Sequence, residues 1–423
     1  MSFADPLSSS PSISRDIAAE AFGFDRRPIR VLYLSTVVAR DTTSGALLIH
    51  RHFALLSSRF SLVSAHDSAA RPVDGNIVEL PRSRLFARIS NSRYLFLAAA
   101  LDAAFGCSVS RSTLKRLMQT IQPDVILTLA EGSLHIPARR LAAAWNCPLV
   151  SVFHDWAPTW QQGPRALRML AERQIRRLYR ASDAVLCIST GLRDALGAKP
   201  GAEVLPPIPG SGTPAAASES NAPFHSAYAG SFQNCYSHEV QSLCRAFAEA
   251  GCTHELRLYG PDPRWPTDRM NLIKDNYRGF LKGGPFEAAI SAASALLVVV
   301  PFDWEAIARY SFPSKIPEYC RFRKPLLIWA PDYATCVEWA KRSGAALVVN
   351  DPDPTSVVRA MARLRDDAAL RHRLGEAAGR AADGEFNPRT LQAIFEGALG
   401  YAARRSCTAS PSVFPVGSKT VPL

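Results

Sequence analysis

One segment in the C-terminal half of the chain carries side chains that suit both a phosphate and a sugar. In the run 311–320, Ser314, Lys315 and Glu318 stand close together. Ser314 can cap a helix, and Pro317 is tolerated in its first turn. The free N–H groups of such a helix start, with the Lys315 ammonium, would attract a diphosphate. The Glu318 carboxylate can accept from two ribose hydroxyls, although Ser314 and Glu318 could equally only cap and charge the helix.

A second candidate pair follows an apolar run of buried-strand type, 150–153. His154 and Asp155 come directly after it, and the ends of parallel strands are where α/β domains present functional side chains. His154 could hydrogen-bond a sugar hydroxyl or stabilise a transition state. Asp155 could orient His154 or cap the next segment. The alternative is an ordinary loop pair.

Two glycine-bearing loops also follow strands. Ser44 and Gly45 come after the run 30–35 and open a helical pattern, while Gly230 and Ser231 end the first strand of the second half. A glycine lets a backbone approach a ligand closely. Neither loop has the Gly-x-Gly-x-x-Gly spacing, which argues against a dinucleotide-binding dehydrogenase. The first loop could equally be a plain strand–helix turn.

These side chains must be positioned by alternating strands and helices. The chain has 423 residues, of which 47% are hydrophobic and 20% charged, enough for two globular cores. Apolar runs predict strands at 30–35, 60–65, 76–80, 124–129, 148–153, 183–189, 203–205, 225–230, 255–259, 277–280, 295–300, 325–328 and 345–349. Helices are predicted at 84–105, 110–121, 134–145, 164–180, 190–196, 236–250, 286–293, 314–322, 333–342, 354–364, 368–382 and 388–403. Such alternation predicts an α/β protein with parallel sheets covered on both faces.

The boundaries follow from composition. We expect a flexible leader at 1–27, a doubly wound domain at 28–205 and a Pro/Ser-rich linker at 206–223. A second doubly wound domain follows at 224–404, whose last helix could cross back to the first domain, and then a disordered tail at 405–423. Two such domains facing each other make a cleft, which is a preferred place for a site.

Charge and cysteine content limit the partners, metal sites and cellular compartment that we expect for this protein. The excess of 49 Lys and Arg over 37 Asp and Glu gives a net charge of +12, which favours anionic partners, unless it only reflects an Arg-rich proteome. Nine cysteines show neither Cys-x-x-Cys nor zinc spacing, so we expect no metal and a reducing compartment. Without a signal peptide or a membrane-length apolar run, we expect a cytoplasmic protein, at most touching the inner face of the membrane.

With these segments in this order, residues 28–400 resemble the GT-B glycosyltransferases, specifically retaining family 4. The likeness rests on three segments: the strand and loop 31–45, Val152-Phe-His-Asp155 with the later 182–193, and Phe312-Pro-Ser-Lys-Ile-Pro-Glu-Tyr319 followed by 324–327. It implies an acceptor-side first domain and a nucleotide-sugar-binding second domain. It also implies that Glu318 holds the ribose, that His154 lies near the donor sugar, and that the Gly45 loop approaches the reacting sugar.

The sequence departs from the family pattern at two places. Relatives usually carry an Arg and then a Lys after the glycine equivalent to Gly230, but here Ser231 follows. Lys315, Arg309 and the helix start would then have to balance the diphosphate. Tyr310 stands where many members have a second Glu, and Asp303 and Glu305 are the candidates to hold donor-sugar hydroxyls in its place.

The resemblance implies transfer of a hexosyl group from a UDP- or GDP-sugar to a carbohydrate or lipid-linked acceptor, with retention, in polysaccharide or glycoconjugate synthesis. Neither a metal nor a cofactor beyond the nucleotide-sugar co-substrate is expected. The alternatives are a sugar-nucleotide epimerase of the same fold and a non-catalytic nucleotide-sugar-binding protein.

Two basic stretches lie in the first half: Arg82, Arg84, Arg88 and Arg93, and then Arg165, Arg168, Arg173, Arg176, Arg177 and Arg180. Beside apolar residues, they could make peripheral contact with an anionic membrane. The alternative is a solvated face. Nucleic-acid binding is not expected, because no recognised module accompanies the charge.

Overall fold

The computed structural model describes residues 27–40, 44–67, 76–92, 94–156, 165–210 and 223–408, and the statements below concern these residues. The predicted leader, apart from Arg27, and most of the predicted linker fall outside this part of the chain. So do Arg93 and the loop residues Thr42 and Thr43 that precede Ser44.

The first half of the chain forms a seven-stranded sheet in which every pairing is parallel. Its strands are β1 (Ile29–Leu34), β2 (Phe60–His66), β3 (Ile77–Glu79), β4 (Val125–Leu129), β5 (Leu149–Phe153), β6 (Ala184–Cys187) and β7 (Ala202–Val204). The order β3-β2-β1-β4-β5-β6-β7 changes direction between β1 and β4, as in doubly wound domains. The helices are α2 (Ser44–Ala54), α3 (Arg84–Ser90), α4 (Leu95–Phe105), α5 (Arg111–Ile121), α6 (His135–Ala144), α7 (Arg165–Ala181) and α8 (Thr190–Leu196).

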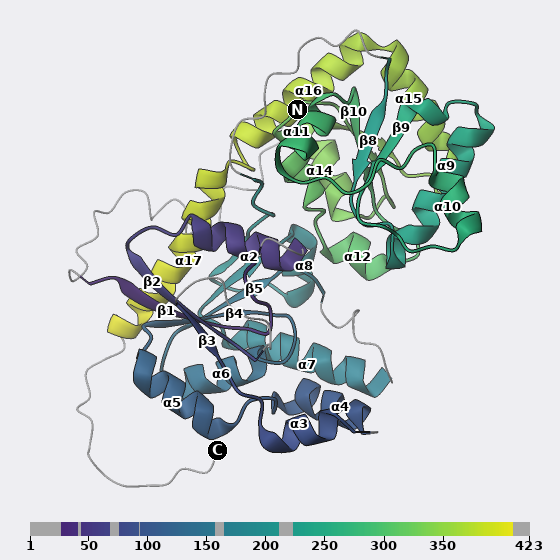
Figure 1. Ribbon diagram of the computed structural model, residues 1–423. Helices are drawn as coiled ribbons and strands as arrows, with labels where there is room; N and C mark the ends of the chain where they lie inside the picture. Colours follow the sequence, from purple (N-terminus) through teal and green to yellow (C-terminus); the bar gives the residue numbers. More distant parts are fainter. Residues whose placement is uncertain are drawn as a thin grey trace, which may run out of the picture.

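The second half forms a five-stranded parallel sheet of order β12-β11-β10-β8-β9. Its strands are β8 (Ser226–Ala229), β9 (Leu256–Tyr259), β10 (Ala295–Val299), β11 (Leu326–Trp329) and β12 (Ala346–Val349). Its α-helices are α9 (Ser237–Glu249), α10 (Thr267–Ile273), α11 (Gly283–Ser291), α12 (Glu305–Tyr310), α13 (Lys315–Cys320), α14 (Thr335–Ser343), α15 (Thr355–Asp366) and α16 (Ala368–Asp383). The predicted α/β class with doubly wound domains is confirmed (Figure 1).

Alternate residues along each strand enter cores on opposite faces of the sheet. In β10, Leu297 and Val299 pack on the side of α9 and α15, whereas Leu296 and Val298 pack on the side of α13 and α14. All four side chains are buried. Burial on both faces explains why the strands are continuous apolar runs and why those runs were recognisable in the sequence.

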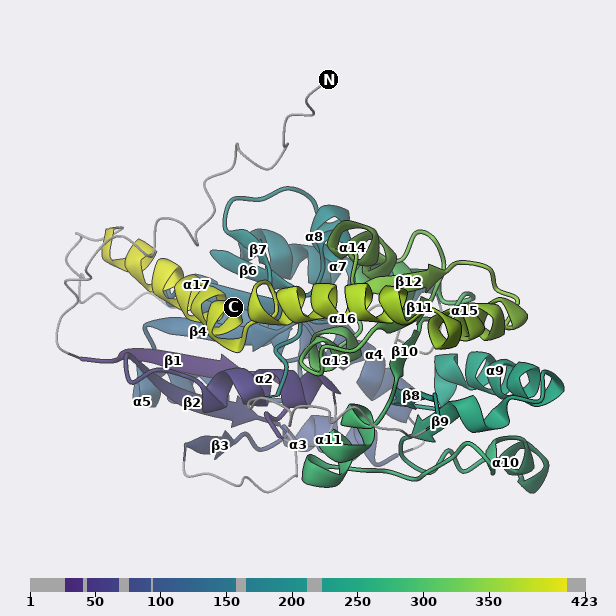
Figure 2. The ribbon, with the colours of Figure 1, turned by 90° about the horizontal axis from the view of Figure 1, so that it is seen from above.

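The last helix, α17 (Pro388–Thr408), leaves the second half and packs on the first sheet. Leu391, Phe395 and Leu399 share a core with residues of β1, β4 and β5. Figure 2 shows α16 and α17 following one another across both domains. α17 also extends to Thr408, into the segment predicted as a tail.

Two predicted elements are wrong. A strand at 277–280 is reduced to an isolated bridge between Tyr277 and Leu258, and Gly279 adopts a φ of +81°, outside the strand region. The single helix predicted at 84–105 is two helices, because α3 ends at Ser90 and the backbone N–H of Asn91 caps it. Asn and Ser favour caps over helix interiors, which explains the break. The short helices α10 and α12 were not predicted.

Candidate active site

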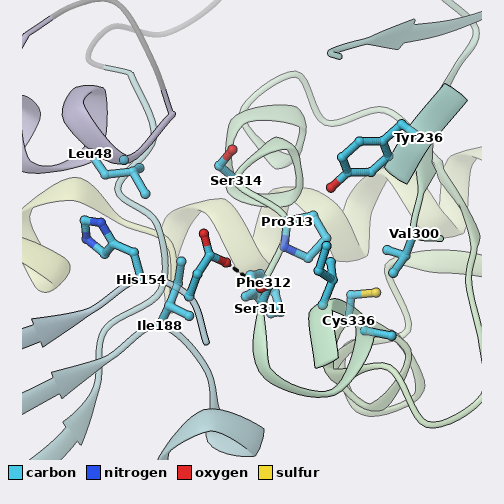
Figure 3. Close-up of a pocket in the computed structure, with 14 residues that line it drawn as sticks. Leu48, His154, Ile188, Tyr236, Val300, Ser311, Phe312, Pro313, Ser314 and Cys336 are labelled. Atoms are coloured by element: carbon cyan, nitrogen blue, oxygen red, sulfur yellow. Dashed lines mark hydrogen bonds between the residues drawn. The ribbon is translucent and has the colours of Figure 1, made fainter. Parts of the chain in front are cut away.

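A pocket lies between the two domains, at the carboxyl ends of the strands (Figure 3). It has a volume of about 190 Å³. Its walls come from both halves of the chain: Gly45, Leu48, His154, Asp155 and Ile188 from the first, and Tyr236, Val300, Ile307, Ala308, Ser311, Phe312, Pro313, Ser314 and Cys336 from the second. Ligand sites commonly enclose ~300–1,000 Å³, so this pocket accommodates a sugar-sized group rather than a whole nucleotide sugar.

His154 stands at the first-domain wall of the pocket, directly after β5. Its side chain is buried, and burial, with His52 nearby, lowers its pKa to about 3. The imidazole is therefore neutral at physiological pH and offers one donor and one acceptor nitrogen. Its Nδ1 atom is buried without a hydrogen-bond partner among the described residues, 3.9 Å from the Oε1 atom of Glu131.

Asp155 connects the two domains. The Ser311 hydroxyl, in the segment between α12 and α13, donates a hydrogen bond of 2.5 Å to the Asp155 carboxylate (dashed in Figure 3). Burial raises the pKa of Asp155, although this hydrogen bond opposes the rise. The Ser189 hydroxyl makes a similar crossing, donating to the backbone carbonyl of Tyr310 at 2.5 Å. In this arrangement of the domains, these two hydrogen bonds join the walls of the pocket.

Lys315 lies against Gly230 and between two tyrosines of the second domain. Its ammonium lies 4.5 Å from the ring centre of Tyr228 and 5.3 Å from that of Tyr236, so two aromatic faces hold it by cation–π contact. Burial lowers the pKa of Lys315 to about 8, which leaves it protonated at neutral pH. The side chain crosses directly over Gly230, where a Cβ atom would lie 2.2 Å from Lys315 Cε. Gly230 is therefore needed for this close approach.

The helix that carries Lys315 is shorter than predicted. α13 spans six residues, and Ser314 takes its N-cap position without a side-chain capping hydrogen bond. The predicted capping role of Ser314 is thus wrong, because its backbone is already helical there. Tyr319 ties α13 to the second sheet, since its hydroxyl accepts from Ala229 N–H at 2.8 Å. In so short a helix the charge available to a phosphate comes mainly from Lys315 rather than from aligned backbone dipoles.

Glu318 lies outside the pocket lining, and three donors from three parts of the chain reach its carboxylate. Arg51 of α2 donates at 3.0 Å and the backbone N–H of Gly210 at 2.9 Å, both to Oε2, and Arg321, directly after α13, donates to Oε1. Its oxygens are occupied in this arrangement of the domains.

Of four further predicted residues, Gly45 and Ser44 lie at the pocket, whereas Arg309 and Tyr310 do not line it. Gly45 lines the pocket, and Ser44 begins α2 beside it. Arg309 points into solvent instead, paired with Glu305 at 2.6 Å and stacked over Tyr333 at 4.3 Å. Tyr310 packs against Trp156 with ring centres 5.3 Å apart.

Three further candidates contribute little to the pocket wall. The Ser231 hydroxyl accepts from Gln233 N–H in a local turn at 3.2 Å. Asp303 and Glu305 are exposed and do not line the pocket.

Comparison with known families fits this geometry. Residues 62–206, most of the first domain, match the family model described as Glycosyltransferase Family 4. No curated protein matches the sequence.

Solved structures match nearly the whole chain. A glycosyltransferase from Rickettsia africae has 11% identity and a TM-score of 0.61, with 91% of this chain and 100% of that chain covered. Anabaena HepE, in complex with UDP and glucose, has 12% identity and a TM-score of 0.61, with coverage of 88% and 99%. A trehalose-phosphate synthase from Burkholderia vietnamiensis has 15% identity and a TM-score of 0.58, with coverage of 88% and 99%. The chain has a GT-B fold with a family 4-like first domain. The family match and the fold support a transferase.

The GT-B arrangement brings in two residues that the sequence analysis missed. Glu131 follows β4 as His154 follows the neighbouring strand β5, and Tyr236 comes from the turn after β8. The signal was available for Glu131, because a polar residue directly after a buried strand reaches the same edge as His154. The Tyr236 ring reaches the pocket only because the short helical turn 234–236 directs it there (Figure 3).

Among the described residues of this GT-B chain, we also looked for metal sites, membrane-spanning helices and disulfides. No three His, Cys, Asp or Glu side chains gather there as a metal site would require. Within the same residues, no helix has the length and apolar character to cross a membrane. The eight cysteines from Cys107 to Cys336 are free.

Proposed function

We propose that this GT-B protein transfers a hexosyl group from a UDP- or GDP-sugar to a carbohydrate or lipid-linked acceptor, with retention and without a metal. The observation that carries the proposal is the pocket between the domains, with His154 on one wall and Ser311–Ser314 on the other. Lys315 stands immediately behind that second wall. Polysaccharide or glycoconjugate synthesis is the setting that we propose for it.

The donor belongs to the second domain in this proposal. Lys315 takes over the role of the cations that usually follow the Gly230 position, because its ammonium occupies the space above that glycine. When the bond to the sugar breaks, negative charge develops on the nucleoside diphosphate, and a fixed, partly desolvated ammonium stabilises it. HepE, which shares the fold, is described as a complex with UDP and glucose, which supports this class of donor.

The sugar itself belongs in the interdomain pocket. A neutral His154 can exchange hydrogen bonds with a hydroxyl without attracting the phosphate charge. With a volume of about 190 Å³, the pocket is too small for the nucleotide, so donor entry requires the domains to separate. Separation would break the Arg51–Glu318 ion pair and so make Oε2 of Glu318 more accessible to the ribose. Reclosure would then exclude water from the reacting centre.

The acceptor belongs to the first domain. Five arginines on α7 are exposed, namely Arg165, Arg168, Arg173, Arg177 and Arg180, together with the apolar Met169. A surface of this kind can bind the head groups of an anionic membrane, because each cation near the membrane surface contributes ~1 kcal/mol of attraction. A lipid-linked acceptor would be presented from that side, and we propose a cytoplasmic enzyme that works at the inner face of the membrane.

The test is a thermal-shift panel of UDP-, GDP- and ADP-sugars, followed by a transfer assay with the stabilising donor. A ligand at 100 times its dissociation constant adds ~2.7 kcal/mol to the free energy of unfolding, a readily measured shift. A chain that none of these donors stabilises would refute the proposal. Donor conversion without an acceptor would instead identify an epimerase, and binding without any turnover would identify a non-catalytic binding protein.

A further inference from the structure

A second, larger pocket lies within the first domain. It has a volume of about 770 Å³, against about 190 Å³ for the pocket between the domains, and small-ligand sites commonly enclose ~300–1,000 Å³. Its walls are the end of α4 with the segment that follows, the first turns of α5, and one side of α6. None of the described residues lines both pockets. A ligand of this second pocket is therefore not the donor sugar.

The wall of this second pocket is largely apolar. Val109 and Leu114 are buried members of the core between the sheet and its helices, and the partly buried Leu141 packs against that core. Two aromatic side chains also line the pocket, and they remain accessible: Phe105 is 55% exposed and Trp145 is 41% exposed. Large apolar side chains that stay exposed beside a cavity mark a surface for an apolar ligand or a membrane. Aromatic rings are also enriched where proteins meet the boundary of a bilayer.

The charged side chains of the pocket are all cationic. Arg111 and Lys115 come from α5 and Arg140 comes from α6, and all three are exposed. Arg140 is held in place because it donates a hydrogen bond of 2.7 Å to the backbone carbonyl of Phe105. Among the described residues, no Asp or Glu lines the pocket, and the neighbouring Asp102 carboxylate accepts a backbone N–H instead. An apolar cavity bordered by cations fits a ligand with a hydrocarbon chain and an anionic head.

The second pocket belongs to the same helical layer as the basic helix α7. α5, α6 and α7 pack on one face of the first sheet, whereas α17 packs on the opposite face (Figure 1). The basic side chains of α6 and α7 are close enough to repel one another. Burial, and then Arg140 and Arg177, lower the pKa of Arg139. An anionic surface against this layer would relieve that repulsion.

We propose that the pocket between α5 and α6 binds one acyl chain of an anionic membrane phospholipid, whose phosphate pairs with Arg111, Lys115 and Arg140. This inference rests on the membrane setting proposed above and not on the glycosyl transfer. The acyl chain covers the apolar wall and is removed from water, and the three cations hold the head group. The bound lipid anchors the first domain to the bilayer while α7 contacts the surrounding head groups. It is a partner and not the acceptor, because the pocket is separate from the one between the domains.

The experiment measures binding of monomeric dihexanoylphosphatidylglycerol to the full chain by calorimetry, and we expect one lipid per chain. Ala144 lines the pocket at an exposed position of α6, so Ala144→Trp fills the pocket without changing charge. It should raise the Kd about 10-fold or more. Lys115→Gln should raise the Kd about 5-fold. It should have little effect on the weaker binding of dihexanoylphosphatidylcholine, which carries no net charge.

Ala248→Trp is the matched control, because Ala248 is exposed on α9 of the second domain. It should leave the Kd for the lipid unchanged, and circular dichroism should show the same fold in all variants. An unchanged Kd in Ala144→Trp, or equal affinity of the wild type for the two lipids, would overturn the proposal. A dimer that Ala144→Trp converts to a monomer would also overturn it, because a second copy of the chain would then occupy the pocket.

Vesicle flotation distinguishes the pocket from the basic surface of α7. Binding to phosphatidylglycerol vesicles should weaken in Ala144→Trp. Vesicle binding that survives Ala144→Trp but is lost in Arg173→Gln would leave α7 as the membrane contact and overturn the role of the pocket. The donor panel and transfer to soluble glycosides require no lipid. Their failure would remove the proposed transfer and leave the lipid site standing, and the absence of lipid binding would leave the transfer standing.

Discussion

The Arg51 guanidinium of α2 lies 3.0 Å from the Glu318 carboxylate of α13, so an ion pair joins the two domains beside the segment that connects them. Arg51 also donates to the backbone carbonyl of Ile208 in that segment at 2.9 Å. The pair is partly buried, which limits screening by salt. A ribose that uses Glu318 must displace Arg51, so the Arg51–Glu318 contact and the binding of a nucleotide to Glu318 compete.

Arg51→Met should therefore tighten donor binding. Removing the guanidinium leaves Oε2 of Glu318 with the Gly210 N–H as its one described donor and favours the separated domains. We therefore expect the Kd for the stabilising nucleotide to fall about 3- to 10-fold, measured by calorimetry. Lys341→Met is the control, because its ion pair with Asp332 is exposed and lies within one domain. A Kd that is unchanged or higher in Arg51→Met would show that Glu318 does not bind the nucleotide.

Gly230→Ala should weaken nucleotide binding without loss of fold. The added Cβ atom would lie 2.2 Å from Cε and 2.3 Å from Nζ of Lys315, and this flexible side chain can move away more easily than the backbone. Displacing the ammonium should raise the Kd for UDP or GDP about 10-fold, close to the effect of Lys315→Met. Gly284→Ala has no atom within 4 Å of its Cβ and is the matched control. Equal affinity of Gly230→Ala and wild type for the nucleotide would show that Lys315 does not bind the diphosphate.

His52 makes the contact between α2 and α17 sensitive to acid. Its ring stacks on Phe395 at 4.5 Å, and its Nδ1 is 2.9 Å from Gln392 Oε1. Burial lowers the pKa of His52 to about 4, against the opposing effect of the Gln392 hydrogen bond. A depressed histidine pKa means that its stabilising effect is present above pH 6.5 and is lost as the pH falls towards 4.

The contribution of His52 should amount to at most about 3 kcal/mol. His52→Phe keeps the stacking and removes the titration. Its thermal midpoint should therefore fall less than that of wild type between pH 7.5 and 5, measured by circular dichroism. Equal acid sensitivity in both proteins would contradict the assignment. The other buried histidines keep part of the acid response in either case.

Glu131→Gln should change the free energy of unfolding at alkaline pH, whereas the effect of His52 appears at acidic pH. The carboxyl pKa is raised to about 7 by burial and by Asp155, so the fold favours the protonated form. Its stabilising effect is present below the unfolded value of 4.5 and is lost as the pH rises through about 7. At pH 8 the glutamine variant should therefore be more stable than wild type by about 1–3 kcal/mol, and by much less at pH 5. Urea unfolding at both pH values measures this, and a constant difference would contradict it.

Gly191→Ala tests the contact between α8 and α12, which joins the domains. A Cβ atom there would lie 2.1 Å from the backbone carbonyl oxygen of Arg309 and 2.7 Å from Thr335. Because a backbone atom cannot move aside cheaply, we expect a loss of about 1–3 kcal/mol or a more open domain arrangement in X-ray scattering. Gly400→Ala in α17 meets no atom within 4 Å and should be neutral or slightly stabilising. Equal stability and scattering would show that the interface is looser than described.

Local sequence was sufficient for the layered fold. The apolar runs such as Leu296–Val299 identify strands buried on both faces, and alternation with helical periods then allows only parallel sheets. The same logic places His154 and Asp155 at a strand end and Lys315 at a helix start. This reasoning gave a wrong strand at 277–280, where Tyr277 forms a single bridge at the edge of the second sheet. It also gave a single helix at 84–105, where the cap at Asn91 interrupts the helical pattern.

The α/β class and the types of side chain at the strand ends can be read from the sequence, because hydrophobic periodicity and turn chemistry act between near neighbours. The folded chain is needed to see that Glu131 lies near His154, that Lys315 fills the space above Gly230, and that Glu318 contacts Arg51. These contacts join residues far apart in the chain. They depend on which strands lie adjacent and on how the two domains meet. Core residues elsewhere in the chain control the strand order and the domain arrangement, so the sequence around each contacting residue does not reveal its partner.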